Sequence, residues 1–231
     1  MQKAQALKQL KTMGTAQNRK VYGRHGATGE IFGVSYANLY QLQKQIGTDQ
    51  KLAEALWTSG NHDARALAAL IADPSKISAR TLDSWAGGLD NYILADSLAR
   101  VAAASPKGRA RLEKWIGARD EFKCAAGWNV LAAMAGHGDE TNAYWEKWIK
   151  VIEKGIHDAK NRVRHSMNQA LIGIGIRNAA LEKKATAAAK RIGKVEVDHG
   201  QTSCKTPDAA AYIKKTVAYR KKKAKKKTSR R

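Results

Sequence analysis

The chain has 231 residues, a length that suits one large domain or one solenoid of stacked helices. It carries 42 Lys and Arg against 20 Asp and Glu, which gives a net charge of +22 at pH 7. No apolar run approaches the ~20 residues that a membrane span needs, and the polar N-terminus lacks the apolar centre of a signal peptide. We therefore expect a soluble protein with no membrane partner.

The positive charge is spread over the whole chain and is densest at the C-terminus. Residues 214–231 hold eleven Lys and Arg and no acid, and the rest still has 31 basic against 20 acidic residues, a net charge of +11. This excess predicts a polyanionic partner, with a merely solubilising surface as the alternative. The only cysteines, Cys124 and Cys204, indicate a reducing compartment. We expect a cytoplasmic monomer, which would associate with the nucleoid if the polyanion is DNA.

Nearly every segment predicts helix, because Ala is abundant, Pro is limited to three residues and alternating strand patterns are almost absent. In the first half of the chain the expected helices are 2–13, 36–46, one that begins after Asp49, one from Asn61 to about residue 73, one that begins at Ser78, and a central helix that begins after Asp90. In the second half they are one from Ser105 and Pro106 to about residue 116, one from Asp120 to about residue 136, 140–154, 160–175, 178–192 and a short helix at 209–216.

Three segments do not fit this pattern. Residues 14–33 are Gly-rich and predicted to be irregular, and residues 194–209 are predicted to be extended or looped. The Lys-rich tail, 214–231, is expected to be disordered because its charges repel. The predicted fold class is all-α: a C-shaped α-solenoid of degenerate HEAT-like helix pairs over residues 1–213, in which 194–213 forms a C-terminal wrap. A globular helical bundle is the alternative.

The central helix follows a Gly-Gly break and separates its apolar and polar residues. Asp90 is the predicted N-cap, with Leu89 packed on Leu94 as a hydrophobic staple. The core stripe is formed by Leu94, Leu98 and Val101. Tyr92 and Asp96 lie four residues apart on nearly the opposite face. One aromatic ring and one carboxylate thus share the face turned away from the core, where we expect the chemistry.

The helix at 160–175 predicts a face that contacts a phosphate backbone. Its core stripe consists of Val163, Met167, Ala170, Leu171 and Ile174. Arg162, His165 and Gln169 fall on another face, with Arg164 beside them. Such positions, repeated along a surface, suit DNA-backbone binding, and Lys123 is expected to contribute from a neighbouring helix.

Tryptophans at helical spacing are usually core residues, and we predict that role for Trp57 and for four of the other five. Trp85, beside the Gly-Gly break, is the one expected to be exposed near the site.

No nucleotide-binding or metalloprotease motif occurs in the sequence: GxxxxGK[ST], GxGxxG after a strand and HExxH are all absent. Asp198, His199 and Cys204 are close in sequence but lack a fourth ligand at a familiar spacing. We therefore predict no metal and no cofactor.

Four stretches of the chain resemble the AlkD-like family of DNA alkylation repair glycosylases. Residues 32–74 resemble that family's FGV segment, followed by a leucine–tryptophan pair and a histidine–acid–x–arginine helix. Residues 89–99 resemble its tryptophan–x–x–x–aspartate helix. The helix of Lys123 resembles a segment with paired arginines, and residues 156–178 complete the similarity, which covers about residues 30–195.

The resemblance implies a HEAT-like solenoid that holds duplex DNA in a basic cleft and excises cationic N3- and N7-alkylated purines without base flipping. Asp96 matches the family's aspartate, which would stabilise the positive charge on the deoxyribose. Tyr92 stands where the family has one tryptophan, and the second falls at Gln169, or at Asn168 if the alignment slips by one residue. Lys123 matches one arginine of the pair, and Cys124 replaces the other.

Three functions follow from these patterns. The leading hypothesis is a DNA glycosylase of alkylation base-excision repair, a hydrolase of N-glycosidic bonds that acts on double-stranded DNA containing alkylated bases. The second is a non-catalytic HEAT-like protein that recognises DNA structure through the backbone. The third is a helical scaffold for an acidic protein or ribosomal RNA.

Overall fold

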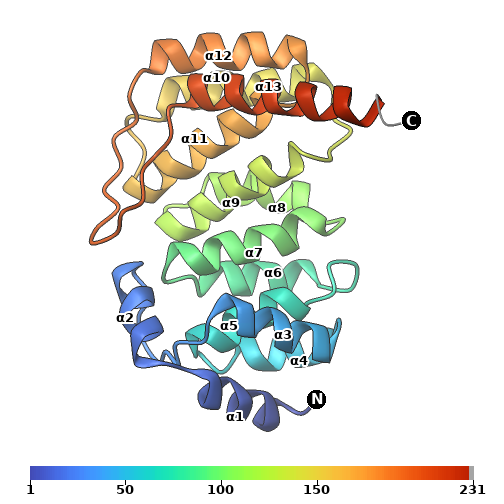
Figure 1. Ribbon diagram of the computed structural model, residues 1–231, viewed down its shortest axis with the longest axis vertical. Coiled ribbons are helices and arrows are strands. Elements are labelled where there is room, and N and C mark those ends of the chain that lie inside the picture. The colour runs from blue at the N-terminus through green and yellow to red at the C-terminus, as the bar shows by residue number, and fades with distance from the viewer. Residues whose placement is uncertain (229–231) are drawn as a thin grey trace. The chain divides into compact units, whose positions relative to one another are not determined.

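The computed structural model describes residues 1–228, and for residues 224–228 it describes the backbone alone. Within this range the protein has thirteen α-helices and no β-strand (Figure 1). The helices are α1 (Lys3–Met13), α2 (Ala16–Arg24), α3 (Tyr36–Ile46), α4 (Gln50–Trp57), α5 (His62–Ile71), α6 (Ala79–Gly87), α7 (Tyr92–Ala104), α8 (Gly108–Ile116), α9 (Glu121–Met134), α10 (Asn142–Gly155), α11 (Asn161–Gly175), α12 (Ala179–Ile192) and α13 (Ala209–Thr228). The all-α prediction is confirmed.

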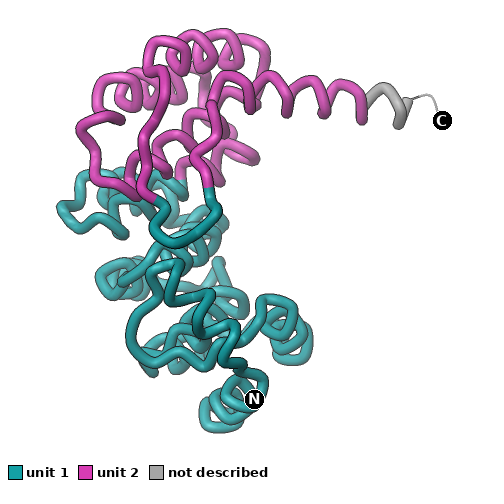
Figure 2. The backbone as a smooth tube through the Cα atoms, turned by 60° about the vertical axis from the view of Figure 1, so that its left-hand side comes forward, with its two compact units in different colours: residues 1–130, 199–204 teal, residues 131–198, 205–231 magenta. Residues whose placement is uncertain are grey.

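The helices form two compact units (Figure 2). Unit 1 contains residues 1–130 and 199–204, and therefore α1 to α8 with most of α9. Unit 2 contains residues 131–198 and the chain from Lys205 onwards, with α10 to α13. Among residues 1–228, no helix is both long and apolar enough to cross a bilayer.

The core of unit 1 is built around α5, which packs against α3, α4 and α7. Leu67 and Ile71 of α5 are fully buried, as are Leu94 and Leu98 of α7. Burying a leucine or isoleucine side chain contributes roughly 1.5–3 kcal/mol, so this apolar contact is a main source of stability for the unit. The predicted core stripe of the central helix is confirmed.

A buried carboxylate on α5 holds the FGV segment. Both oxygens of Asp63 accept backbone N–H bonds: Oδ2 from Phe32 at 2.7 Å and Gly33 at 3.1 Å, and Oδ1 from Val34 at 2.7 Å. Gly33 has φ of +81°, and a Cβ there would lie 2.4 Å from the carbonyl oxygen of Thr15. Only glycine fits this turn, which explains the FGV pattern together with its distant acid.

Residues 14–33 are more regular than predicted, because α2 occupies much of this segment. Thr15 caps the helix by accepting a bond from the backbone N–H of Asn18 at 3.2 Å. The glycines that suggested an irregular segment lie at its ends and beyond it, and only Gly23 lies inside α2, next to its last residue. Tyr22 of α2 is buried, and its hydroxyl donates to the carbonyl of Val34.

Two predicted helix starts are wrong by one or two residues. Asn91, not Asp90, caps α7, and its side chain accepts a bond from the N–H of Leu94 at 3.1 Å. The helix predicted from Ser105 begins at Gly108, after Lys107 as N-cap. Propensity cannot choose between adjacent capping residues, and the packing of the first turn decides.

The predicted disordered tail differs from the structure, in which α13 continues to Thr228. Lysine and alanine favour helix and no Gly or Pro interrupts residues 214–228, so the helix outlasts the expected 209–216. Residues 229–231 of the predicted tail lie outside the described residues.

Candidate functional site

Asp96 lies on the second turn of α7 and is half-buried. Its Oδ1 accepts a hydrogen bond of 2.7 Å from the side-chain amide of Asn129 on α9. The bond joins residues of two helices that are 33 positions apart in sequence, and it orients the carboxylate. A single residue thus carries both a negative charge and a structural contact.

Tyr92, one turn before Asp96, is held from the side of α2. Its hydroxyl is hydrogen-bonded to Nδ1 of His25, the residue that follows α2, and the two rings meet edge-on with centroids 5.8 Å apart. Both side chains are half-buried. His25 was missed by sequence reasoning, because it lies in the segment predicted to be irregular and 67 residues away from its partner.

A second tyrosine lies near the carboxylate. The hydroxyl of Tyr36, at the start of α3, is 3.5 Å from Oγ of Ser97. Burial raises the pKa of Tyr36 above its ordinary value, and the negative charge of Asp96 acts in the same direction, whereas Ser97 and Arg100 oppose it. Tyr36 therefore stays protonated at neutral pH and can donate a hydrogen bond.

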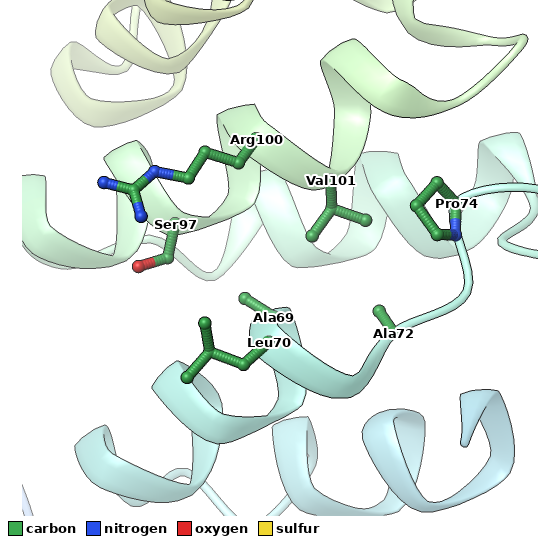
Figure 3. Close-up of a pocket in the computed structure, with 7 residues that line it drawn as sticks. All are labelled: Ala69, Leu70, Ala72, Pro74, Ser97, Arg100 and Val101. Carbon is green, nitrogen blue, oxygen red and sulfur yellow. The ribbon is translucent and has the colours of Figure 1, made fainter. Parts of the chain in front are cut away.

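A small pocket of about 170 Å³ lies between α5 and α7, on the flank of this cluster (Figure 3). Its lining is mostly apolar, with one hydroxyl and one cation, and consists of Ala69, Leu70, Ala72, Pro74, Ser97, Arg100 and Val101. Neither Asp96 nor Tyr92 lines it, so the pocket does not join the carboxylate and the ring in one cavity.

The prediction that Trp85 is exposed near the site is wrong. Its side chain is 3% exposed and stacks on Trp57, with ring centroids 4.3 Å apart and planes 5° from parallel. Arg65 lies over the other ring of this stack, 5.8 Å from the centroid of Trp57. All six tryptophans of the chain are buried, as predicted for the other five.

Lys123 lies in the first turn of α9 and is half-exposed. Its backbone N–H donates to Oδ1 of Asp120 at 2.8 Å, which confirms the predicted start of this helix. The neighbouring Cys124 thiol contacts the carbonyl of Ile116 at 3.1 Å. A DNA contact through Lys123 stays a prediction.

In unit 2 the polar face of α11 contacts the chain at residues 196 and 206. Arg164 donates from Nε to the carbonyl of Ala159 at 2.7 Å and from a terminal nitrogen to that of Glu196 at 3.2 Å. Nδ1 of His165 lies 3.1 Å from the hydroxyl of Thr206. The C-terminal wrap over 194–213 stays a prediction, and the contacts seen here use two residues that were predicted to contact DNA, Arg164 and His165. Their phosphate contacts, and that of the half-exposed Arg162, stay predictions.

The two residues that could align with the second family tryptophan, Asn168 and Gln169, have different surroundings in the structure. Asn168 is 1% exposed and donates to the carbonyl of Pro207 at 2.9 Å. Gln169 is half-exposed, and its amide nitrogen lies 3.4 Å from Nε2 of His165. Gln169 is therefore the one that shares the polar face of α11. Asp96 and Tyr92 come together in unit 1, whereas Gln169 belongs to unit 2.

Within residues 1–228, no three side chains of His, Cys, Asp or Glu cluster as metal ligands would.

The sequence pattern of the DNA alkylation repair enzymes matches residues 4–213, almost the full length of the chain. The chain belongs to the DNA alkylation repair enzyme family. The chain is also similar to uncharacterised proteins of Listeria innocua and Listeria monocytogenes, with 27% and 26% identity over 213 residues. Each alignment covers 90% of this chain and 93% of the relative.

The fold of this DNA alkylation repair protein is similar to that of a relative whose structure has been solved. It matches with a TM-score of 0.86 and 29% identity, over 95% of both chains. That protein belongs to a family described as related to the HEAT-like repeat DNA glycosylases, with affinity for branched DNA structures. The predicted HEAT-like repeat fold is confirmed.

Proposed function

We propose that this member of the DNA alkylation repair family binds branched DNA through the phosphate backbone and does not excise bases. The observation that carries the proposal is how far the aromatic side chains are buried and which residues they contact. Trp85 is stacked inside the core, and Tyr92 is half-buried with its ring against that of His25. An aromatic cradle for a cationic base needs ring faces that the base can reach. The affinity described for the solved relative supports the same reading.

Asp96 has a structural role in this proposal. A carboxylate that faced phosphates without another function would weaken DNA binding by repulsion. Here it accepts the amide of Asn129 and so links α7 to α9. The acid is therefore compatible with a protein that only binds DNA.

The charge of the chain supplies the affinity. With 42 basic residues and a net charge of +22, the protein suits contacts to phosphates that carry no sequence information. Such binding is governed by the geometry of the backbone, which differs between a junction and a linear duplex.

A second candidate, hydrolysis of the N-glycosidic bond of N3- or N7-alkylated purines, is favoured by the surroundings of Asp96. The carboxylate is half-buried near Tyr36 and one turn from Tyr92. A carboxylate ~4 Å from a sugar cation gains about 4 kcal/mol at an effective dielectric of ~20. A tyrosine face adds roughly 0.5–2 kcal/mol for a cationic base.

One experiment separates the two candidates. Wild type and Asp96→Asn are titrated with a three-way junction and with a linear duplex of the same arm sequences, and are incubated with duplex containing 7-methylguanine and 3-methyladenine without added metal. We expect both proteins to prefer the junction by about tenfold or more and to release no free base. Base release by the wild type that Asp96→Asn abolishes would overturn the proposal and establish the glycosylase. Glu113→Gln, an exposed acid on α8, is the matched control.

A further inference from the structure

One face of α13 fixes this helix on unit 2. Ile213 is fully buried and Ala209 is 7% exposed. The contact is close, because a Cβ on Gly175 of α11 would lie 2.6 Å from Cδ1 of Ile213. Further along, Arg220 donates to the carbonyl of Ile176 at 2.8 Å. These contacts set the rotation of α13 about its axis.

A neighbouring face of α13, roughly a quarter turn away from the packed one by helical spacing, presents two tyrosines to solvent. Tyr212 is 47% exposed and Tyr219 is 65% exposed, the largest exposure of any large hydrophobic side chain that the structure describes. Seven residues correspond to about two turns and ~10.5 Å, so both rings lie on one side of the helix. Lys215, Lys222 and Lys223 are exposed and share that side by helical spacing. We call these five residues the α13 stripe.

The charge around the α13 stripe identifies the class of partner. Between residues 209 and 223 there are six Lys and Arg and no acid. The later turns of α13 project beyond the other helices of unit 2 in both views (Figures 1 and 2). An exposed cationic helix without acids repels itself and gains from binding a polyanion.

The two rings distinguish between kinds of polyanion. In duplex DNA the base faces are stacked inside, so a duplex offers phosphates to the lysines but nothing to the tyrosines. A single strand offers both, and sequence-tolerant binders of single strands combine aromatic platforms with cations in this way. The ~10.5 Å between the ring positions corresponds to about three stacked nucleotides at 3.4 Å each.

We propose that the α13 stripe binds unpaired DNA strands, with Tyr212 and Tyr219 stacking on bases and the lysines contacting phosphates. The inference rests on the proposed function, because it identifies the feature of a branched substrate, the unpaired bases, that this part of the protein would bind.

The test compares Tyr212→Ala/Tyr219→Ala with wild type by fluorescence anisotropy on three labelled DNAs. These are a thymidine single strand of about 20 nucleotides, a linear duplex of about 20 base pairs, and a three-way junction with arms of about 20 base pairs and unpaired bases at its centre. We expect the double variant to lose at least about fivefold in affinity for the single strand for each ring removed. Affinity for the duplex should change less than about twofold, since all lysines remain. Tyr212→Trp/Tyr219→Trp should retain single-strand binding. Tyr40→Ala, an exposed tyrosine on α3, is the control.

Failure of this inference is distinguishable from failure of the proposed function. If the wild type prefers the junction but the double variant binds the single strand normally, the stripe assignment is overturned and the proposed function stands. Equal losses on single strand and duplex would also overturn the stacking role. If vesicles containing phosphatidylserine capture the protein through these tyrosines while the single strand does not bind, the partner is a membrane surface and the proposal is wrong. Far-UV circular dichroism confirms that each variant folds.

Discussion

At the scale of single residues, the start of α5 concentrates buried polar groups. Asn61, His62 and Asp63 are each no more than 3% exposed. Asn61 caps the helix, and Asp63 binds the FGV backbone through three N–H bonds. The ring of His62 packs at a tilt against Tyr22, with centroids 5.1 Å apart. Each of these side chains has a bonding or packing contact that accounts for its burial, although Nδ2 of Asn61 has no hydrogen-bond partner among the described residues.

His62 makes stability depend on pH. Burial lowers its pKa below the ordinary value, although Asp63 and Asp90 oppose the shift. The unfolded chain therefore takes up a proton first as the pH falls through ~6.5, and the unfolded state is favoured. We expect the free energy of unfolding to be highest above ~pH 7 and to fall towards pH 5, with a slope from this group of at most ~1.4 kcal/mol per pH unit.

The measurement is urea unfolding between about pH 5.5 and pH 7.5. His62→Gln should flatten the dependence on pH, while His137→Gln, which changes an exposed histidine, should leave it as in wild type. An unchanged slope in His62→Gln would mean that another group is responsible.

At the scale of elements, helix caps place the site residues. Asp49, Asn61 and Ser78 cap the helices that they were predicted to cap, each by accepting a backbone N–H bond. For α7 the cap is Asn91, whose side chain also donates to Oδ1 of Asp90 at 2.6 Å. Because Tyr92 begins the helix that Asn91 caps, the cap orients the turn that carries the ring.

Substitutions at Asn91 and Asp90 test which of the two residues stabilises the start of α7. Asn91→Ala should lower the free energy of unfolding by about 1 kcal/mol or more, since the N–H of Leu94 loses its acceptor. Asn91→Asp should retain most of the stability, because aspartate caps equally well. Asp90→Ala removes the ion pair with Arg65 at 3.4 Å and the bond from Asn91, but it leaves the cap in place. A larger loss for Asp90→Ala than for Asn91→Ala, measured by chemical denaturation, would restore Asp90 as the important residue.

At the scale of the whole molecule, we expect the excess of positive charge to determine how strongly DNA binding depends on salt. The three lysines at 221–223 of α13 are exposed, and the sequence around them contains no acid. Phosphate contacts by such residues release counterions, so binding weakens linearly with the logarithm of the salt concentration. The slope therefore reports how many cations contact DNA.

Lys221→Gln/Lys222→Gln/Lys223→Gln should reduce that slope by up to roughly 2.7, or about 0.9 for each phosphate that is no longer neutralised. Glutamine keeps the helix propensity of α13 nearly unchanged, so a loss of structure is not expected. The matched control replaces Lys8, Lys11 and Lys51, three exposed lysines of unit 1. Affinity for duplex DNA is measured over a series of salt concentrations, and equal slopes for wild type and the α13 variant would show that these lysines do not bind DNA.

The sequence by itself determined the properties that depend on near neighbours and on totals. The helical class, most caps, the core stripes of α7 and α11 and the basic character follow from propensity, periodicity and composition, which are local or additive. The same patterns predicted Tyr92 and Asp96 on the face turned away from the core, whereas in the structure both are half-buried.

Only the tertiary structure decided which side chains form contacts between distant parts of the chain. Trp85 stacks on Trp57, His25 binds Tyr92, and Arg164 holds the segment after α12. Each of these contacts joins residues that are between 28 and 67 positions apart in sequence. No periodic signal marks them, because what such a side chain contacts is set by the packing of helices against one another rather than by its neighbours in the chain.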